Sequence, residues 1–119
     1  MRTNLSCAGR EFTPTEGIVL KDFGEIQLDV NEQVTVTTGT GPGNDIVRKN
    51  WGFYLTNSLN HSLRRRGFRT ALIVGETSLA PKLFIALVEE ARTDQFLMEL
   101  SATNSRILTW LDTWLPSEK

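Results

Sequence analysis

Residues 46–74 read IVRKNWGFYLTNSLNHSLRRRGFRTALIV, and the changes of pattern within this stretch decide the fold that the sequence predicts. The stretch begins as an extended run, repeats leucine every four residues in its middle, and ends in an apolar, β-branched segment. These patterns are typical of a strand, a helix and a second strand. We therefore expect a strand over 45–54, a helix over 56–66 and a strand over 69–75.

The expected helix is defined by its leucines and by its end. Leu55, Leu59 and Leu63 fall on one face, because about 3.6 residues make one helical turn. Gly67 stands where a residue of left-handed conformation would end the helix. The three arginines before it would lie in the last turn, where basic side chains complement the helix dipole.

Alternation within the expected strand 45–54 separates two kinds of side chain. Trp51 and Phe53 fall on one face, which we expect to be part of the core. Arg48 and Tyr54 fall on the other face, which is amphipathic rather than apolar. Aromatic groups next to basic groups resemble, in composition, surfaces on which nucleic-acid bases stack.

Toward the C-terminus, the pattern predicts a second strand and a second helix. Residues 82–88 are apolar enough to pair with 69–75 at the centre of the sheet, after a polar turn over 75–81. A helix is expected over 93–103, with its apolar side chains on one face. Residues 105–115 suit either a helical stripe or an edge strand, so both alternatives stay open.

Toward the N-terminus, polar and apolar residues alternate over 25–30 and again over 33–38, which predicts a hairpin. Residues 1–17 follow neither period and are expected to form an irregular arm, after which 18–20 could add a short edge strand. Glycines dominate 39–44. They lead into an extended run rather than a helix, so a long hairpin connection is favoured over a phosphate-binding loop.

Together these elements predict an α+β fold. Their order, β-α-β-β-α-β, is that of ferredoxin-like folds. We expect a two-layer sandwich with a mainly antiparallel sheet, helices on one face and extra N-terminal strands. The predicted organisation is an N-terminal arm over 1–17 and a single domain over 18–119. No motif in the chain identifies a family.

Charge is distributed unevenly along the chain. The chain of 119 residues has 13 basic and 14 acidic residues, yet 46–74 contains six basic residues and no acidic one. A local excess of one sign suits an anionic partner. The candidate ligand-binding residues are Arg48, Lys49, Tyr54, Arg64, Arg65, Arg66 and Arg69.

Two functional classes follow from this charge. The first is a non-catalytic binding module whose basic patch faces an anionic ligand or an acidic protein surface. Nucleic acid is one such partner, although the overall pI of about 5.8 disfavours it. The second is a structural or regulatory protein-interaction domain, with a homodimer as one form. In either class, the arginines could instead only complement the helix dipole and solvate the surface.

Catalytic and metal chemistry are poorly provided for. The single histidine, His61, lies off the leucine face, and the single cysteine, Cys7, has no second cysteine with which to form a redox pair or zinc site. No metal-binding spacing is present, so we expect no enzyme activity and no cofactor. The sequence contains neither a secretory leader nor a membrane-length apolar run, and we expect a cytoplasmic protein.

Overall fold

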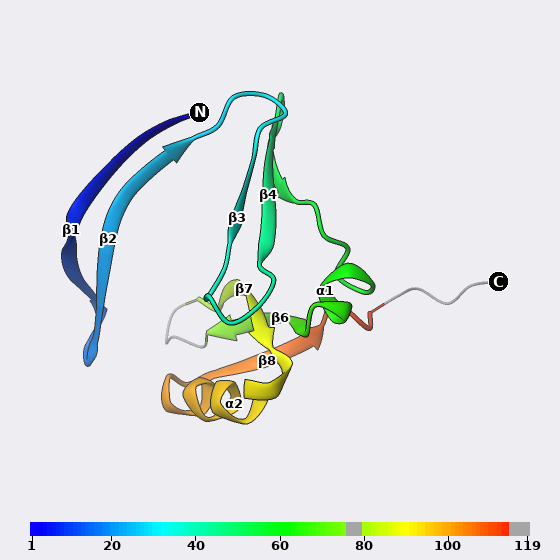
Figure 1. Ribbon diagram of the computed structural model, residues 1–119. Helices are drawn as coiled ribbons and strands as arrows, with labels where there is room; N and C mark the ends of the chain where they lie inside the picture. The colour runs from blue at the N-terminus through cyan, green and yellow to red at the C-terminus, as the bar shows by residue number, and fades with distance from the viewer. Residues whose placement is uncertain (76–79, 115–119) are drawn as a thin grey trace. The chain divides into compact units, whose positions relative to one another are not determined.

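The computed structural model describes residues 1–75 and 80–114, and most of the described chain is β structure (Figure 1). Two helices and one 3-10 turn accompany the strands. The elements are β1 (Arg2–Thr15), β2 (Ile18–Gln27), β3 (Gln33–Val36), β4 (Asn44–Lys49), β5 (Gly52–Leu55), α1 (Ser62–Arg65), β6 (Phe68–Gly75), β7 (Lys82–Glu89), η1 (Glu90–Arg92), α2 (Thr93–Ala102) and β8 (Ser105–Trp110).

The predicted ferredoxin-like sandwich is wrong. Instead of one broad sheet, the described strands form three small antiparallel sheets, ordered β1-β2, β3-β4-β5 and β7-β6-β8. The chain divides into two compact units, one of Met1–Thr35 with Asp45–Leu55 and one of Val36–Asn44 with Thr56–Lys119. The expectation of a single domain over 18–119 stays a prediction.

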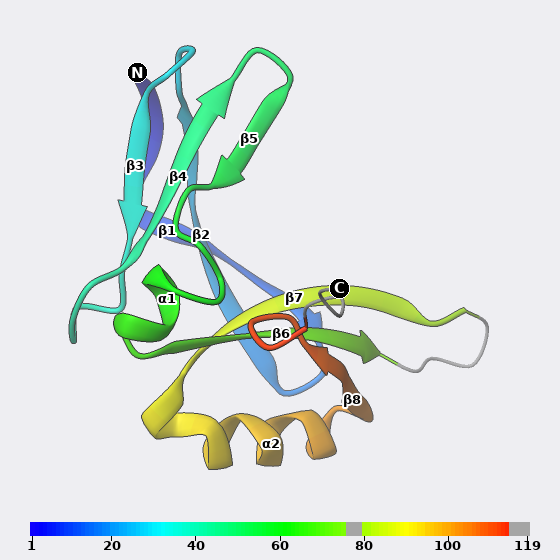
Figure 2. The ribbon, with the colours of Figure 1, turned by 90° about the vertical axis from the view of Figure 1, so that its right-hand side faces the viewer.

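The sheet β7-β6-β8 carries the hydrophobic core of its unit, with α2 packed across one face (Figure 2). Ala71 and Ile73 of β6 meet Leu100 of α2. Partly buried apolar side chains complete the cluster, namely Ala86, Phe96, Ile107 and Trp110. Strands β6, β7 and helix α2 match the expected elements closely, and the ambiguous segment 105–115 begins as strand β8; Leu115 and the turn residues 76–79 lie outside the described residues.

Strand pairing within this sheet explains why the expected topology does not form. In a ferredoxin-like order, a strand from before the first helix would sit inside the sheet. Here β8 pairs directly with β6, and β7 pairs with the other side of β6. Lys49 faces Gly52 across the pair β4–β5, which shows that the segment 45–54 reverses its direction at residues 50–51. A segment folded back on itself cannot supply one long central strand.

The turn also changes which side chains share a face. Tyr54 pairs with Val47, and Phe53 pairs with Arg48, so Tyr54 does not share the face of Arg48 as expected. Trp51 and Phe53 are exposed rather than in the core. The prediction carried a strict alternation through a two-residue turn, and the turn shifts that alternation by reversing the chain.

Helix α1 is much shorter than the expected helix 56–66. It spans Ser62–Arg65, and the Ser58 hydroxyl accepts a hydrogen bond from the N–H of Ser62 at 2.9 Å. Serine, asparagine and histidine dominate 57–62, and these residues favour turns over helix interiors. The end of the helix is as expected. Gly67 has φ of +87° and its N–H donates to the Arg64 carbonyl at 3.0 Å.

Strands β1 and β2 form a long hairpin where the sequence suggested an irregular arm and a strand over 25–30. β1 occupies Arg2–Thr15, and β2 runs from Ile18 only to Gln27. The register slips between Leu5 and Arg10, where β1 has more residues than its partner. Such a bulge breaks the period of two along β1, which is why alternation does not reveal this strand in the sequence.

We predict that Ile73→Ala lowers the free energy of unfolding by about 2–4 kcal/mol, since it removes buried methyl groups and leaves a cavity. Ile85→Ala makes the same chemical change on the neighbouring strand and should cost less than about 1 kcal/mol. The difference follows from exposure, which is 8% for Ile73 and 56% for Ile85. Urea unfolding of both variants measures it. Equal losses would show that β6 does not carry the core.

Candidate functional site

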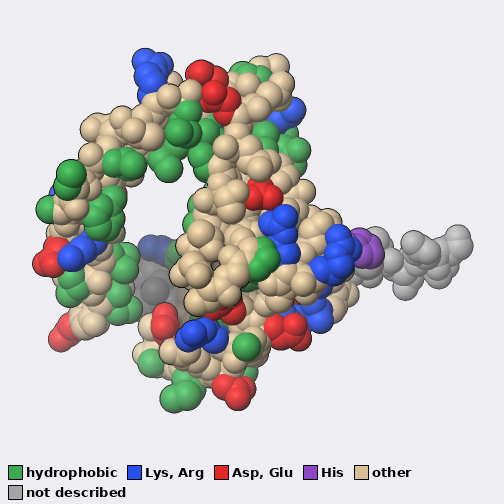
Figure 3. Space-filling model, in the orientation of Figure 1, with side chains coloured by type: hydrophobic (Ala, Val, Ile, Leu, Met, Phe, Trp, Pro, Cys, Tyr) green, Lys and Arg blue, Asp and Glu red, His purple; other side chains and the backbone are tan. Residues whose placement is uncertain are grey.

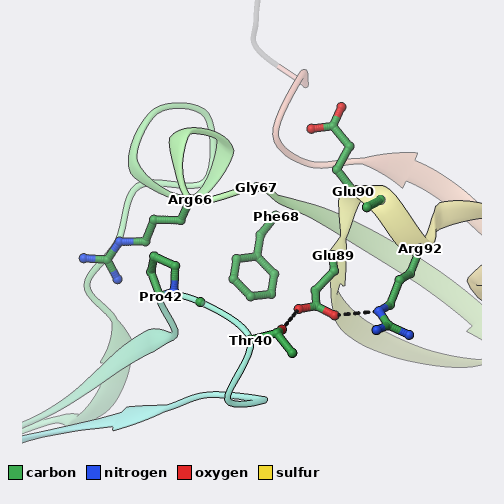
Figure 4. Close-up of a pocket in the computed structure, with 10 residues that line it drawn as sticks. Thr40, Pro42, Arg66, Gly67, Phe68, Glu89, Glu90 and Arg92 are labelled. Atoms are coloured by element: carbon green, nitrogen blue, oxygen red, sulfur yellow. Dashed lines mark hydrogen bonds and ion pairs between the residues drawn. The ribbon is translucent and has the colours of Figure 1, made fainter.

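A cavity of about 620 Å³ lies within the second unit, between three segments that are distant in sequence (Figure 4). The glycine-rich loop before β4 forms one wall, the turn between α1 and β6 forms another, and the end of β7 with η1 forms the third. Its lining residues are Thr40, Gly41, Pro42, Arg66, Gly67, Phe68, Glu89, Glu90, Ala91 and Arg92.

Glu89 fastens the glycine-rich loop to the end of β7. Its Oε2 accepts hydrogen bonds from the hydroxyls of Thr40 at 2.8 Å and Thr38 at 3.1 Å, while its Oε1 lies 3.2 Å from Nε of Arg92. The Thr40 and Thr38 hydroxyls, with the Arg92 charge, hold the pKa of Glu89 below its usual value. The carboxylate is therefore ionised and largely occupied by contacts within the chain.

Arg66 holds the other end of the loop. Its Nη1 donates to the Gly43 carbonyl at 2.7 Å. Gly43 must be glycine at this place, because a Cβ there would lie 2.2 Å from the Val36 carbonyl oxygen. The loop is thus anchored at both ends by a charged side chain, rather than being an unsupported connection.

The cavity carries charges of both signs. Arg66 lies on the Pro42 side of Phe68, and Arg92 lies on the Glu89 side (Figure 4). The two guanidinium groups therefore do not meet at one point. Glu90 adds a second carboxylate, 3.9 Å from Nη2 of Arg64. This arrangement suits an elongated or multiply charged ligand better than a single compact anion.

Asp112, which sequence reasoning missed, gathers two of the predicted basic residues. Its carboxylate is completely buried and accepts hydrogen bonds from Nη2 of Arg69 at 2.9 Å and from the N–H of Thr70 at 2.7 Å. Nη1 of Arg64 lies 3.4 Å away. The Arg69 guanidinium also lies over the Trp110 ring, 4.1 Å from its centroid. This cluster is an internal ion-pair network that attaches the segment after β8 to β6.

The balance of forces on Asp112 favours its charged form. Burial by itself raises the pKa of this carboxyl group, but the hydrogen bonds from Arg69 and Thr70 and the nearby arginine charges outweigh burial, and the pKa lies below its usual value. The same hydrogen bond raises the pKa of Arg69. Arg64 and Arg69 are thus engaged by a buried partner within the chain, and their role in ligand binding stays a prediction.

The remaining predicted residues of the second unit differ from each other. Arg66 lines the cavity, whereas Arg65 is exposed on α1. In the first unit, Arg48 donates to the carbonyls of Leu28 and Lys49, both at 3.0 Å. Lys49 donates to the Asn31 side chain at 2.7 Å. These basic groups stabilise a turn and a strand edge of their own unit.

Tyr54 is half-exposed, and its ring centroid lies 5.6 Å from that of Trp51. The two rings are tilted by 33° relative to each other, which is a contact between aromatic side chains. Tyr54, Trp51 and Phe53 therefore form an exposed aromatic group on the hairpin β4–β5.

Two further site residues, Arg92 and Asp112, lie outside the stretch 46–74 that drew attention in the sequence. Arg92 follows the Glu89-Glu90 pair after one alanine, so opposite charges close together at the end of a strand are the signal in the sequence. Asp112 stands between two tryptophans in an apolar segment. A charge in such a setting indicates a buried, paired group, because burial of an unpaired carboxylate is costly.

One face of the β1–β2 hairpin is apolar and exposed. Cross-strand partners share a face, and the partners on β2 are spaced by two residues, so these pairs lie on the same side of the hairpin: Thr3–Ile26, Leu5–Gly24, Arg10–Asp22 and Phe12–Leu20. The exposed fractions of its large apolar residues lie between 36% and 56%, for Leu5, Phe12, Leu20 and Ile26. Figure 3 shows hydrophobic side chains spread along this hairpin. The side chains of Arg10 and Asp22, 3.3 Å apart, lie between the pair Leu5–Gly24 and the pair Phe12–Leu20.

Catalytic and metal groups are sparse in the part of the chain that the structure describes. His61 precedes α1 and is exposed, as is Cys7 on β1. No three His, Cys, Asp or Glu side chains in residues 1–75 and 80–114 are placed to hold a metal ion. Within the same residues, no helix has the length and apolar character needed to cross a membrane.

Comparison with known proteins finds no relative: no family model, curated protein or solved structure matches the chain significantly.

We predict that Asp112→Asn lowers the free energy of unfolding by about 2–4 kcal/mol at neutral pH, because Arg69 loses its buried partner. The folded-state pKa of Asp112 is depressed, so its contribution is complete above the unfolded value near pH 4 and is lost as pH falls through the folded value. Unfolding curves should thus show a stability loss below about pH 4 that is smaller in the variant.

Glu99→Gln provides the matched control, since Glu99 is an exposed carboxylate on α2. This variant should unfold within about 0.5 kcal/mol of the wild type and keep its acid profile. A wild-type acid profile retained by Asp112→Asn would contradict the proposed role of the buried carboxylate.

Proposed function

We propose that this chain is a non-catalytic protein-interaction module that binds another polypeptide through the apolar face of the β1–β2 hairpin. The observation that supports this function is the exposure of Leu5, Phe12, Leu20 and Ile26 on one side of the hairpin. Several large apolar side chains exposed on one side of a surface element suit a partner that covers them.

The hairpin also lacks the usual support of a stable sheet. Its sheet contains two described strands, and two strands without a covering layer are marginally stable in water. A partner that covers the apolar face would bury these side chains and contribute stability of about 25 cal/mol for each Å² of apolar surface removed from water.

The polar pair within the face defines the chemistry of the partner. Arg10 and Asp22 lie between the pair Leu5–Gly24 and the pair Phe12–Leu20. The matching surface is therefore apolar at two places, with a hydrogen-bonding or charged group between them. A uniformly apolar partner would bury this ion pair and leave its remaining donors and acceptors without hydrogen-bond partners.

We predict that Leu20→Lys weakens binding of this partner at least about tenfold, because it places a charge at the centre of an apolar contact. The neighbouring substitution Val19→Lys adds the same charge to the opposite face of β2 and should leave binding unchanged. Both positions are exposed, so both variants should unfold within about 0.5 kcal/mol of the wild type.

The measurement has two steps. The partner is first found by cross-linking from a probe on the hairpin in its native cells, and the purified pair is then titrated with the wild type and each variant. Selective loss in Leu20→Lys supports the proposal. Equal affinity of all three chains, or equal loss in both variants, would exclude the apolar face as the binding surface.

A second candidate function is binding of a polyanion at the cavity beside the glycine-rich loop. Arg66 and Arg92 bring two guanidinium groups to its opposite sides, and exposed backbone of the loop lies between them. Glu89 and Glu90 oppose this function, although Glu89 is already compensated by Arg92 and two hydroxyl groups. An extended anion could contact both arginines without approaching Glu89 closely.

We predict that Arg92→Gln and Arg66→Gln each weaken heparin binding at least about threefold and lower its dependence on salt, because each removes a charge that displaces counterions. Arg65→Gln is the matched control, since Arg65 is exposed on α1 and does not line the cavity. Titration across a salt series distinguishes the cases. Equal effects of all three substitutions would indicate a diffuse attraction to the basic segment and would exclude the cavity.

A further inference from the structure

Strand β7 is an open edge of the sheet β7-β6-β8. It pairs with β6 without interruption from Lys82 opposite Gly75 to Glu89 opposite Phe68. No other described strand pairs with it. An edge strand of this kind presents a row of backbone N–H and C=O groups on its outer side, and these groups can pair with another strand.

The opposite edge of the same sheet is protected, whereas β7 is not. The pairing of β8 with β6 contains a bulge between Leu72 and Ile73, and β8 carries the exposed Arg106. Bulges and charges are common devices that prevent strands from adding to an edge. Residues 83–88 have no bulge, proline, glycine or charged side chain.

The N-terminal half of β7 is also unusually apolar for an exposed segment. Leu83, Phe84 and Ile85 have exposed fractions between 55% and 61%, although they alternate between the two faces of the sheet. One covering layer could not bury both sets. An additional strand beside β7 could contact side chains on both faces at once.

We propose that β7 pairs in antiparallel orientation with β7 of a second copy of this chain. This proposal concerns a surface other than the β1–β2 hairpin and does not depend on the function proposed above. A two-fold axis normal to the sheet keeps the same faces together, so each residue opposes one of equal parity. An axis at Ile85 places Leu83 opposite Leu87 and Phe84 opposite Ala86, all apolar pairs.

Charge complementarity at the ends of the strand supports a second copy as the partner. β7 begins with the exposed Lys82 and ends at Glu89, which Glu90 follows. With the axis at Ile85, Lys82 of each copy lies opposite Val88 of the other and one residue from Glu89, whose carboxylate also contacts Arg92 of its own chain. The protected β8 strands would then be the outer edges of a six-stranded sheet, so the assembly closes as a dimer rather than growing into a fibre.

Cysteine scanning tests this geometry. In a Cys7→Ser background, Ile85→Cys places the two thiols opposite each other at the axis, within the range of a disulfide. Leu83→Cys is equally exposed, but its two copies would be separated by four residues, or about 13 Å along the strand. Mild oxidation should therefore link Ile85→Cys into dimers at least about ten times faster than Leu83→Cys.

Sedimentation over a concentration series provides an independent measurement. Ile85→Lys should raise the dimer dissociation constant at least about tenfold, because a lysine at the centre of a strand edge opposes pairing. Leu97→Lys, on an exposed position of α2, should leave it unchanged. Circular dichroism confirms that both variants are folded.

Some results would overturn the inference. These are a wild-type chain that stays monomeric at every concentration, cross-linking that is equally fast at positions 83 and 85, and open-ended fibres in place of a dimer. Dimers that persist in Ile85→Lys but not in Leu20→Lys would assign self-association to the hairpin face instead.

Discussion

The buried carboxylate of Asp112 is the interaction on which the second unit depends. It joins three donors, Arg69, Arg64 and the Thr70 N–H, at the point where the chain leaves β8. A carboxylate that is buried away from water stays ionised only when such donors compensate for its lost hydration. The network therefore holds β8 beside β6, and it does so by using two arginines that otherwise would be counted as a ligand-binding surface.

Most basic side chains of the stretch 46–74 have partners within the chain. Arg48 and Lys49 bind carbonyl and amide oxygens in one unit, while Arg64, Arg66 and Arg69 bind oxygens in the other. Apart from the Lys49 carbonyl that Arg48 also contacts, these partners are distant in sequence. Because guanidinium groups have several donors, an arginine-rich segment can satisfy internal oxygens as readily as an external anion.

Residues 68–102 show how much of the fold the sequence predicts. The β-branched run of β6, the apolar run of β7 and the apolar face of α2 each have one clear local interpretation, and all three form close to the expected bounds. The predicted strands are wrong where the chain turns or bulges. A two-residue reversal at 50–51 and a bulge in β1 both interrupt the period of two, and neither contains a strong turn signal such as Asn-Gly.

By itself, then, the sequence determined the elements whose hydrophobic period is unbroken. It also determined the end of α1 at Gly67. Both depend on conformational preferences of residues that are neighbours in the chain. Tertiary structure alone decided which strands pair, where the glycine-rich loop lies, and what the arginines contact. The pairing of β8 with β6, the contact of Glu89 with Thr40, and the cluster at Asp112 all join residues at least 30 positions apart. No local pattern specifies such contacts, since their energies depend on which groups the folded backbone brings together.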